Sequence, residues 1–135
     1  RRLPMNLTDS PFVLLAHVHV KPGCVDEYLK AAATVDKAVE DSEPGMLLHN
    51  FDADPDDPCA FTWTEVYQND AALLAHLQNP PVADYLKIHA ELGDGFTVEV
   101  YGNLAEATIE AINGIDIPWK HHRTTRVGYI RQSLY

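Results

Sequence analysis

The chain has 135 residues, 46% of them apolar, and this length suits one compact domain spanning residues 1–135. Its formal net charge of −10 at pH 7 disfavours nucleic acid and anionic membrane surfaces as partners, because both bind through Lys and Arg. No apolar run approaches the roughly 18 residues that cross a bilayer, and no hydrophobic signal region follows the first two arginines, so we expect a soluble cytoplasmic protein.

The first predicted elements are a strand and an amphipathic helix. Residues 12–20 are apolar and β-branched, and Lys-Pro-Gly closes this run as a turn. Apolar residues then recur at helical spacing from Val25 to Val39, with Asp, Glu and Lys between them. Pro44 and Gly45 should end this helix, because Pro lacks an amide donor and Gly accepts a left-handed conformation.

A β-hairpin, a broken helix and a last strand follow. The pattern predicts strands at residues 46–52 and 59–68, joined by an acidic turn that contains prolines. A second helix should begin near Asn69, and the Asn-Pro-Pro break at residues 79–81 divides it into two pieces. Residues 96–101 alternate between apolar and polar types, which favours a final strand.

This order of elements predicts an α+β fold of the ferredoxin-like type. In that β-α-β-β-α-β arrangement, an antiparallel sheet carries both helices on one face. The core should occupy about residues 11–104, and residues 105–135 should form a C-terminal extension. Within this extension we expect a helix at residues 105–113 and strand character at residues 127–132.

The second face of the sheet predicts a protein partner. It would include Val13 and Leu15 and would leave an apolar surface uncovered in a monomer. We therefore expect a homodimer formed through the sheet faces. Residues 115–135 contain four basic residues and one acidic residue, so this segment should dock on an acidic surface of its own subunit or of its partner.

The stretch from Glu43 to Lys87 resembles the antibiotic biosynthesis monooxygenase (ABM) family of dimeric α+β barrels. The resemblance is carried, in the family's order and spacing, by Pro44-Gly45, Asp54-Pro55, Phe61, Glu65-Val66-Tyr67, Ala71-Ala72-Leu73 and His76. With the strand at residues 12–20 included, it covers about residues 12–101.

The resemblance implies a monooxygenase that needs no cofactor. Its substrate would be O2 together with an aromatic phenol, a quinol or a polyketide-like small molecule. The same fold also hosts cyclases, isomerases and lyases, and small-molecule-binding proteins without catalysis, so the fold alone does not decide the function.

His76 is the first candidate for a catalytic base. A cofactor-free oxygenase must take a proton from an activated phenol or enol, so that the resulting carbanion can give an electron to O2. His76 lies one turn from Leu73 on the inward face of the second helix, where a neutral imidazole could accept this proton. A histidine that only packs is the alternative. Tyr67 is expected to hydrogen-bond the substrate oxygen.

Several further side chains are expected to bind the substrate. One face of the strand at residues 59–68 carries Phe61, Trp63, Glu65 and Tyr67, because side chains alternate along a strand. These would form an aromatic wall with one acid, although ordinary core or dimer packing is the alternative. The remaining expected contacts are His49, Asn50, which could hydrogen-bond an oxyanion, Tyr85 and His89.

His17 and His19 form a His-x-His pair whose spacing could serve a metal. His49 or Glu65 could add a third ligand. However, the pair would lie on the face assigned to the dimer, where histidines that hydrogen-bond between subunits are the alternative.

His89 follows Tyr85 by one helical turn, near the position where the heme-degrading branch of the superfamily has its iron ligand. That branch also implies an Asn and a Trp near the positions where this chain has Ala16 and His76. We therefore expect neither a metal nor another cofactor.

Overall fold

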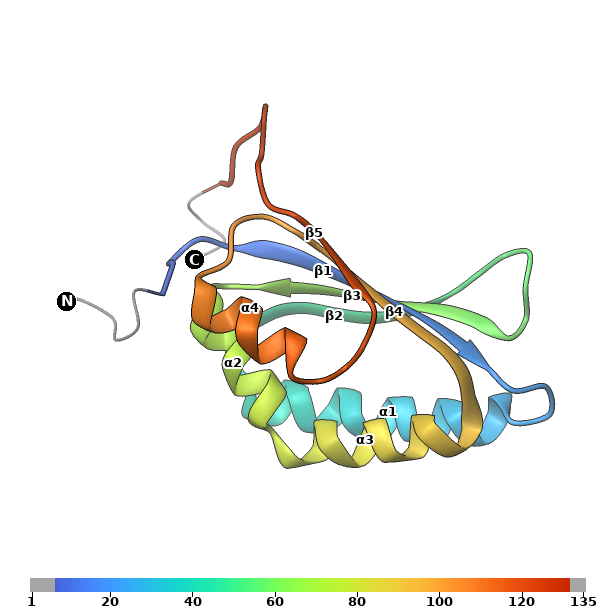
Figure 1. Ribbon diagram of the computed structural model, residues 1–135. Coiled ribbons are helices and arrows are strands. Elements are labelled where there is room, and N and C mark those ends of the chain that lie inside the picture. The colour runs from blue at the N-terminus through green and yellow to red at the C-terminus, as the bar shows by residue number, and fades with distance from the viewer. Residues whose placement is uncertain (1–6, 132–135) are drawn as a thin grey trace.

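The structure is a computed structural model that describes residues 7–131 (Figure 1). Its elements are, in order, β1 (Phe12–Val20), α1 (Val25–Ser42), β2 (Met46–Ala53), β3 (Ala60–Tyr67), α2 (Asp70–Gln78), α3 (Pro80–Leu92), β4 (Gly93–Tyr101), α4 (Glu106–Asn113) and β5 (Trp119–His122). The elements from β1 to β4 confirm the predicted fold, and the break at Asn79 separates α2 from α3. No helix within residues 7–131 is long and apolar enough to cross a membrane.

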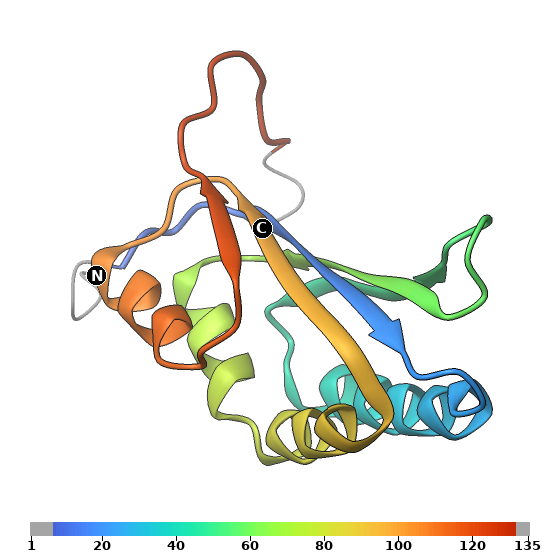
Figure 2. The ribbon, with the colours of Figure 1, turned by 45° about the vertical axis from the view of Figure 1, so that its right-hand side comes forward.

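Five strands form one open sheet in the order β2-β3-β1-β4-β5. The first four pair in antiparallel fashion, and β5 joins the edge of β4 in parallel. The helices lie on one side of this sheet, and the described residues place no helix on its other side (Figures 1 and 2). Because the sheet is open, the barrel that the family resemblance implies would need a second copy of the chain.

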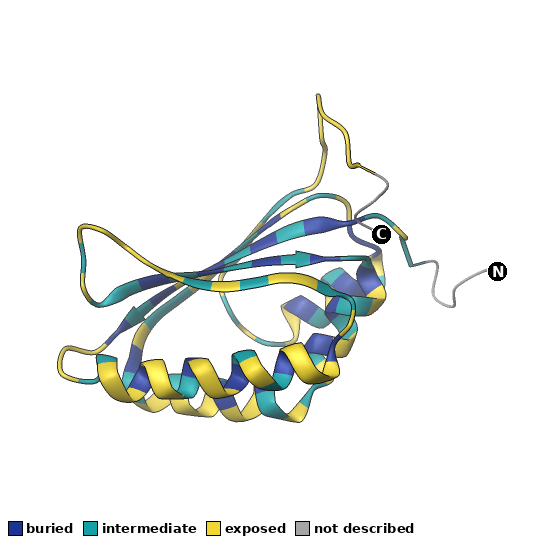
Figure 3. Cartoon of the chain, turned by 180° about the vertical axis from the view of Figure 1, so that it is seen from behind, coloured by how far each residue is buried: buried dark blue, intermediate teal, exposed yellow. Residues whose placement is uncertain are grey.

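Side-chain alternation decides which residues form the core. Along β1 the buried positions Phe12, Leu14, Ala16, Val18 and Val20 face the helices. Helix α1 buries the stripe Tyr28, Ala32, Val35 and Val39 against them and exposes most of its charged residues (Figure 3). Each fully buried Val or Leu side chain contributes about 1.5–3 kcal/mol relative to an exposed one, so this interface stabilises the layer of helices on the sheet.

Strand β4 begins three residues earlier than predicted. Gly93 and Gly95 pair with Val20 and His19 at the end of β1, so the glycine-rich segment belongs to the sheet. A Cβ atom at Gly93 would lie 2.2 Å from Cε1 of His89. Glycine is therefore what allows α3 to pass directly into β4 beside this histidine ring.

The C-terminal extension differs from its prediction in one element. A helix forms at Glu106–Asn113, close to the expected residues 105–113, but residues 127–131 form no strand, and residue 132 lies outside the described residues. The strand of the extension is instead β5, which pairs with Val98–Tyr101. The arm beyond residue 123 leaves the sheet (Figure 2), so its β-branched and aromatic residues have no neighbouring strand to pair with.

Candidate functional site

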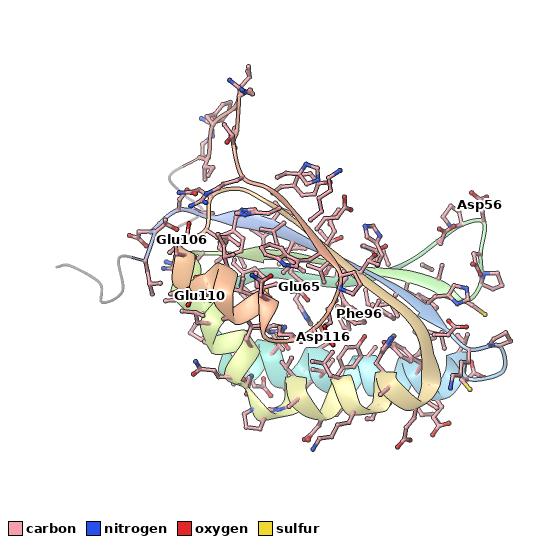
Figure 4. The ribbon with its side chains drawn as sticks, in the orientation of Figure 1. Asp56, Glu65, Phe96, Glu106, Glu110 and Asp116 are labelled. Atoms are coloured by element: carbon pink, nitrogen blue, oxygen red, sulfur yellow. The ribbon has the colours of Figure 1, made fainter. Side chains whose placement is uncertain are left out.

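A cavity of about 80 Å³ lies between the helices and the inner face of the sheet. Most of its wall is aliphatic or aromatic, and its polar side chains include His49, Glu65, Tyr67, His76 and Tyr85. Figure 4 shows Glu65 in the interior between sheet and helices, whereas Asp56 lies far away on the hairpin between β2 and β3. The cavity is therefore an apolar site with a small set of polar groups, as expected for binding an organic molecule.

Six of the nine side chains predicted for catalysis or substrate binding line this cavity: His49, Trp63, Glu65, Tyr67, His76 and Tyr85. The structure places the other three elsewhere. Asn50 is exposed, because it follows His49 along β2 and so points to the opposite face of the sheet. Phe61 is buried nearer the hairpin, where it stacks on Phe51 with ring centroids 4.9 Å apart. His89 does not line the cavity, and it contacts the cavity wall by packing edge-on against Phe96 and through its hydrogen bond with Tyr28.

His76 is held by a carboxylate that the sequence analysis did not select, that of Glu43. Nδ1 of His76 lies 3.0 Å from Oε1 and 3.1 Å from Oε2 of Glu43, and both residues are buried. Asn79 donates from Nδ2 to Oε2 of Glu43 at 2.8 Å and so fixes the carboxylate. Because a carboxylate only accepts hydrogen bonds, Nδ1 carries the ring proton and Nε2 is left to accept one.

A sequence signal for Glu43 does exist. It follows Val35 and Val39 at intervals of four residues and therefore continues the buried stripe of α1 beyond the end of the helix. A carboxylate on a buried stripe is costly unless it has a hydrogen-bond or charge partner. Its position alone therefore indicates a buried polar contact, although not the identity of the partner.

Glu65 is the centre of a second polar group. The Tyr67 hydroxyl donates to its Oε1 at 2.5 Å, and Nε2 of His49 lies 3.5 Å from its Oε2. Nδ1 of His49 lies 2.8 Å from Oδ1 of Asp36, and the His49 ring stacks on Trp63 with centroids 4.4 Å apart. The group thus joins the interior carboxylate to a half-exposed carboxylate on α1.

The charges of this group follow from its partners. Burial would raise the pKa of Glu65, but the hydrogen bond with His49 and the positive charges that His76 and His49 carry when they are protonated outweigh burial and lower that pKa. Burial would likewise lower the pKa of His49, but Glu65 and Asp36 raise it above the ordinary value. Glu65 is therefore ionised at neutral pH, and His49 is more readily protonated than a free histidine.

We expect His49 to make stability depend on pH. The pKa of His49 is higher in the folded protein than in the unfolded chain, where it is about 6.5. Protonation of His49 therefore contributes its full stabilisation below about pH 6.5, and this contribution is lost as the pH rises through the folded pKa. The lowered pKa of Glu65 adds stability above about pH 4.3, which is lost only in stronger acid. Urea unfolding of the wild type and of His49→Gln should therefore show a stability difference that shrinks between pH 6 and pH 9. A constant difference over that range would contradict the charge assignment.

A chain of hydrogen bonds leads from the cavity wall towards His89. Trp63 donates from Nε1 to the Tyr85 hydroxyl at 2.9 Å, and this hydroxyl hydrogen-bonds that of Tyr28. The Tyr28 hydroxyl lies 2.7 Å from Nδ1 of His89. Burial raises the pKa of Tyr85 to about 12 and lowers the pKa of His89, so both are neutral at pH 7.

His17 and His19 lie on the outer face of the sheet, away from the cavity. Nε2 of His17 lies 2.6 Å from Oε1 of Glu99, and Nδ1 of His19 lies 2.5 Å from Oδ1 of Asp94, so the two rings contact different carboxylates. In the part of the chain that the structure describes, no three or more His, Cys, Asp or Glu side chains are grouped to hold a metal ion.

Comparison with known proteins decides the family. The model of the antibiotic biosynthesis monooxygenase (ABM) family matches residues 11–90. This chain belongs to the ABM family. A curated relative, the uncharacterized protein sll1783 of Synechocystis, is 30% identical over 84 residues, which are 62% of this chain and 56% of that protein. The chain therefore spans about half the length of this relative.

Several solved structures share the fold of this chain. Protein SO0527 of Shewanella oneidensis has a TM-score of 0.65 and 23% identity, covering 70% of this chain and 92% of that one. A candidate ABM protein of Caulobacter crescentus has a TM-score of 0.66 and 18% identity, covering 70% of this chain and 90% of that one. A candidate ABM protein of Chloroflexus aurantiacus has a TM-score of 0.59 and 25% identity, covering 67% of this chain and 90% of that one.

Proposed function

We propose that this protein is a cofactor-independent monooxygenase that oxidises an aromatic phenol, a quinol or a related polyketide-like compound in the cavity. The Glu43–His76 pair supports this most directly. A buried carboxylate orients an imidazole at the wall of an apolar cavity, which leaves Nε2 available as a general base. Membership of the ABM family supports the type of reaction.

His76 would start the reaction by taking the proton of the substrate hydroxyl. The phenolate is rich in electrons, so its ring carbon can give an electron to O2 and then bond to oxygen. One oxygen atom remains in the product as a carbonyl, and the other leaves as water with two hydrogens from the substrate. A phenol plus O2 thus becomes a quinone plus water without an external reductant, and the apolar wall keeps bulk water from the intermediates.

The other polar groups would orient the substrate and balance its charge. Burial and the charge of Glu65 raise the pKa of Tyr67 well above its ordinary value, so Tyr67 stays protonated and donates to Glu65. Its oxygen could then accept a hydrogen bond from a second hydroxyl of the substrate, such as that of a hydroquinone. Protonated His49 would stabilise the phenolate electrostatically. Its ring and Trp63 would supply a flat surface for the aromatic ring.

Oxygen uptake tests the proposal. The protein is dialysed against a chelator, its metal content is measured, and phenols, quinols, naphthols and anthrone are added while dissolved O2 is recorded. We expect uptake by the metal-free protein, with one atom of isotopically labelled O2 in the product. Uptake that requires an added metal would overturn cofactor independence. Conversion without uptake would favour cyclase, isomerase or lyase chemistry by the same base, and binding without conversion would favour a binding protein.

We also propose that two copies pair through the outer faces of their sheets. Within residues 7–131 the helices cover only the inner face, and the outer face carries partly buried Val13 and Leu15 together with Leu48, which is 39% exposed. Apolar surface of this kind is typical of an interface. The arm after residue 123, in which Val127 is 94% exposed, carries basic residues that a second acidic copy would attract.

Sedimentation velocity would test the dimer. The wild type should sediment with twice the mass of the chain, and Leu15→Lys should sediment as a monomer, because a charge in the apolar centre of the interface would lose its water without gaining a partner. A wild type that stays monomeric at high micromolar concentration would contradict the proposal.

A further inference from the structure

Part of the cavity wall comes from outside the residues that the family model matches. Four lining side chains, Ile112, Ile115, Ile117 and Trp119, belong to α4, to β5 and to the loop between them. The family match ends at residue 90. Figure 2 shows this segment at the side of the molecule, where α4 lies beside α2 and β5 runs along the edge of the sheet. The extension thus completes a cavity whose chemical groups lie within the family match.

Hydrogen bonds hold this segment at both ends. Before α4, the amide of Ala105 donates to Oδ1 of Asp70 at 3.1 Å. At β5, the amide of Val98 donates to the carbonyl of Pro118 at 2.9 Å, and the β4–β5 ladder continues from there. Within the segment, Nε1 of Trp119 donates to Oδ1 of Asn113 at 2.8 Å. The wall is therefore attached to both α2 and the sheet.

The size of the cavity limits what it can hold. Its volume is about 80 Å³. An apolar cavity that binds benzene measures about 150 Å³, and pockets for drug-sized ligands measure about 300–1,000 Å³. One aromatic ring therefore needs only small shifts of side chains, whereas fused rings would have to displace the wall. Three of the four extension residues are isoleucines, whose β-branched side chains have few alternative rotamers.

We propose that Ile112, Ile115, Ile117 and Trp119 are specificity-determining residues that restrict the cavity to single-ring phenols and hydroquinones. This inference rests on the function proposed above for the same cavity, and it narrows the substrate by size. Fused-ring phenols carry the same hydroxyl group, so the chemistry of His76 and Tyr67 would not reject them. The side chains of the extension reject them by occupying the space of the second ring.

Calorimetric binding of 4-methylphenol and 2-naphthol tests the proposal without any turnover. The affinity of the wild type for 4-methylphenol should be at least about tenfold higher than its affinity for 2-naphthol. Apolar pockets discriminate between ligands of different size by factors of this order. Ile117→Ala and Ile112→Ala should remove this preference by strengthening the binding of 2-naphthol. Ile109→Ala is the matched control, because Ile109 lies on α4 and packs against the core but does not line the cavity.

Each outcome has a definite meaning. A wild type that binds both phenols equally, or binds neither, would overturn the size limit. Alanine variants whose affinities for both phenols fall to the same extent would also overturn it. If the preference and its loss are observed but no compound supports oxygen uptake, the size limit stands and the monooxygenase proposal falls. Ile117 is less buried than Ile112, so Ile117→Ala keeps the test available if Ile112→Ala does not fold.

Discussion

Replacing His76 with alanine is expected to lower the rate of oxygen uptake by about 10²- to 10⁴-fold, the contribution typical of a positioned general base. Glu43→Gln should lower it by about 10- to 100-fold, as does the loss of other groups that orient a functional histidine. The amide nitrogen of glutamine can donate to Nδ1 of His76 and thereby move the ring proton to Nε2, where it blocks the base. The measurement is the initial rate of O2 loss with the best substrate of the panel.

A suitable control for this experiment is His17→Ala. His17 lies on the outer face of the sheet and contacts Glu99 rather than any residue of the cavity, so its variant should keep the wild-type rate. The circular dichroism and the melting temperature of each variant establish that it is folded. A folded His76→Ala variant with undiminished uptake would show that His76 only packs.

Asp70→Ala is expected to lower the free energy of unfolding by about 2–4 kcal/mol, because each buried amide left without an acceptor costs about 1–3 kcal/mol. Asp70 is completely buried in the first turn of α2. Its Oδ2 accepts from the amide of Thr8 at 2.9 Å and from the Thr8 hydroxyl, and its Oδ1 accepts from the amide of Ala105 at 3.1 Å. One carboxylate thus connects the segment before β1, the start of α2 and the start of α4.

Urea titration of three variants measures this contribution. Asp70→Asn keeps one side-chain oxygen as an acceptor and should lose less stability than Asp70→Ala. Asp84→Ala is a matched control on the exposed side of α3 and should remain close to the wild type. In Asp70→Ala, hydrogen exchange should also become faster in α4, because its attachment to α2 is lost. Equal stabilities of Asp70→Ala and Asp84→Ala would contradict this role.

Local patterns were sufficient for the elements of the core but not for the last strand. Each core element buries one face, so alternation or helical spacing is visible in the residues themselves. Strand β5 is the short sequence Trp-Lys-His-His, which lacks such a pattern and is extended because β4 offers a parallel neighbour. Residues 127–131 have the composition of a strand, but they lie outside the sheet and form none.

The same distinction applies to the site. Alternation along β3 was enough to group Trp63, Glu65 and Tyr67 on one face. Alternation along β2 could also have excluded Asn50, because Asn50 and its neighbour His49 point to opposite faces of the sheet. The pairing of Glu43 with His76 joins residues 33 positions apart. It depends on how the end of α1 packs beside α2, and no short-range pattern encodes that packing.

The parallel pairing of β5 also changes how the protein can be shortened. An edge strand without a neighbour offers free amides and carbonyls to other chains, and such edges are frequent starting points of aggregation. Strand β5 covers this edge of β4 at Val98–Tyr101, and it is itself only four residues long and contains Lys120, two features that discourage further strand addition. A chain cut before residue 105 would lose the cavity wall and uncover an aggregation-prone edge in one step. Single substitutions such as Ile117→Ala keep these two effects separate.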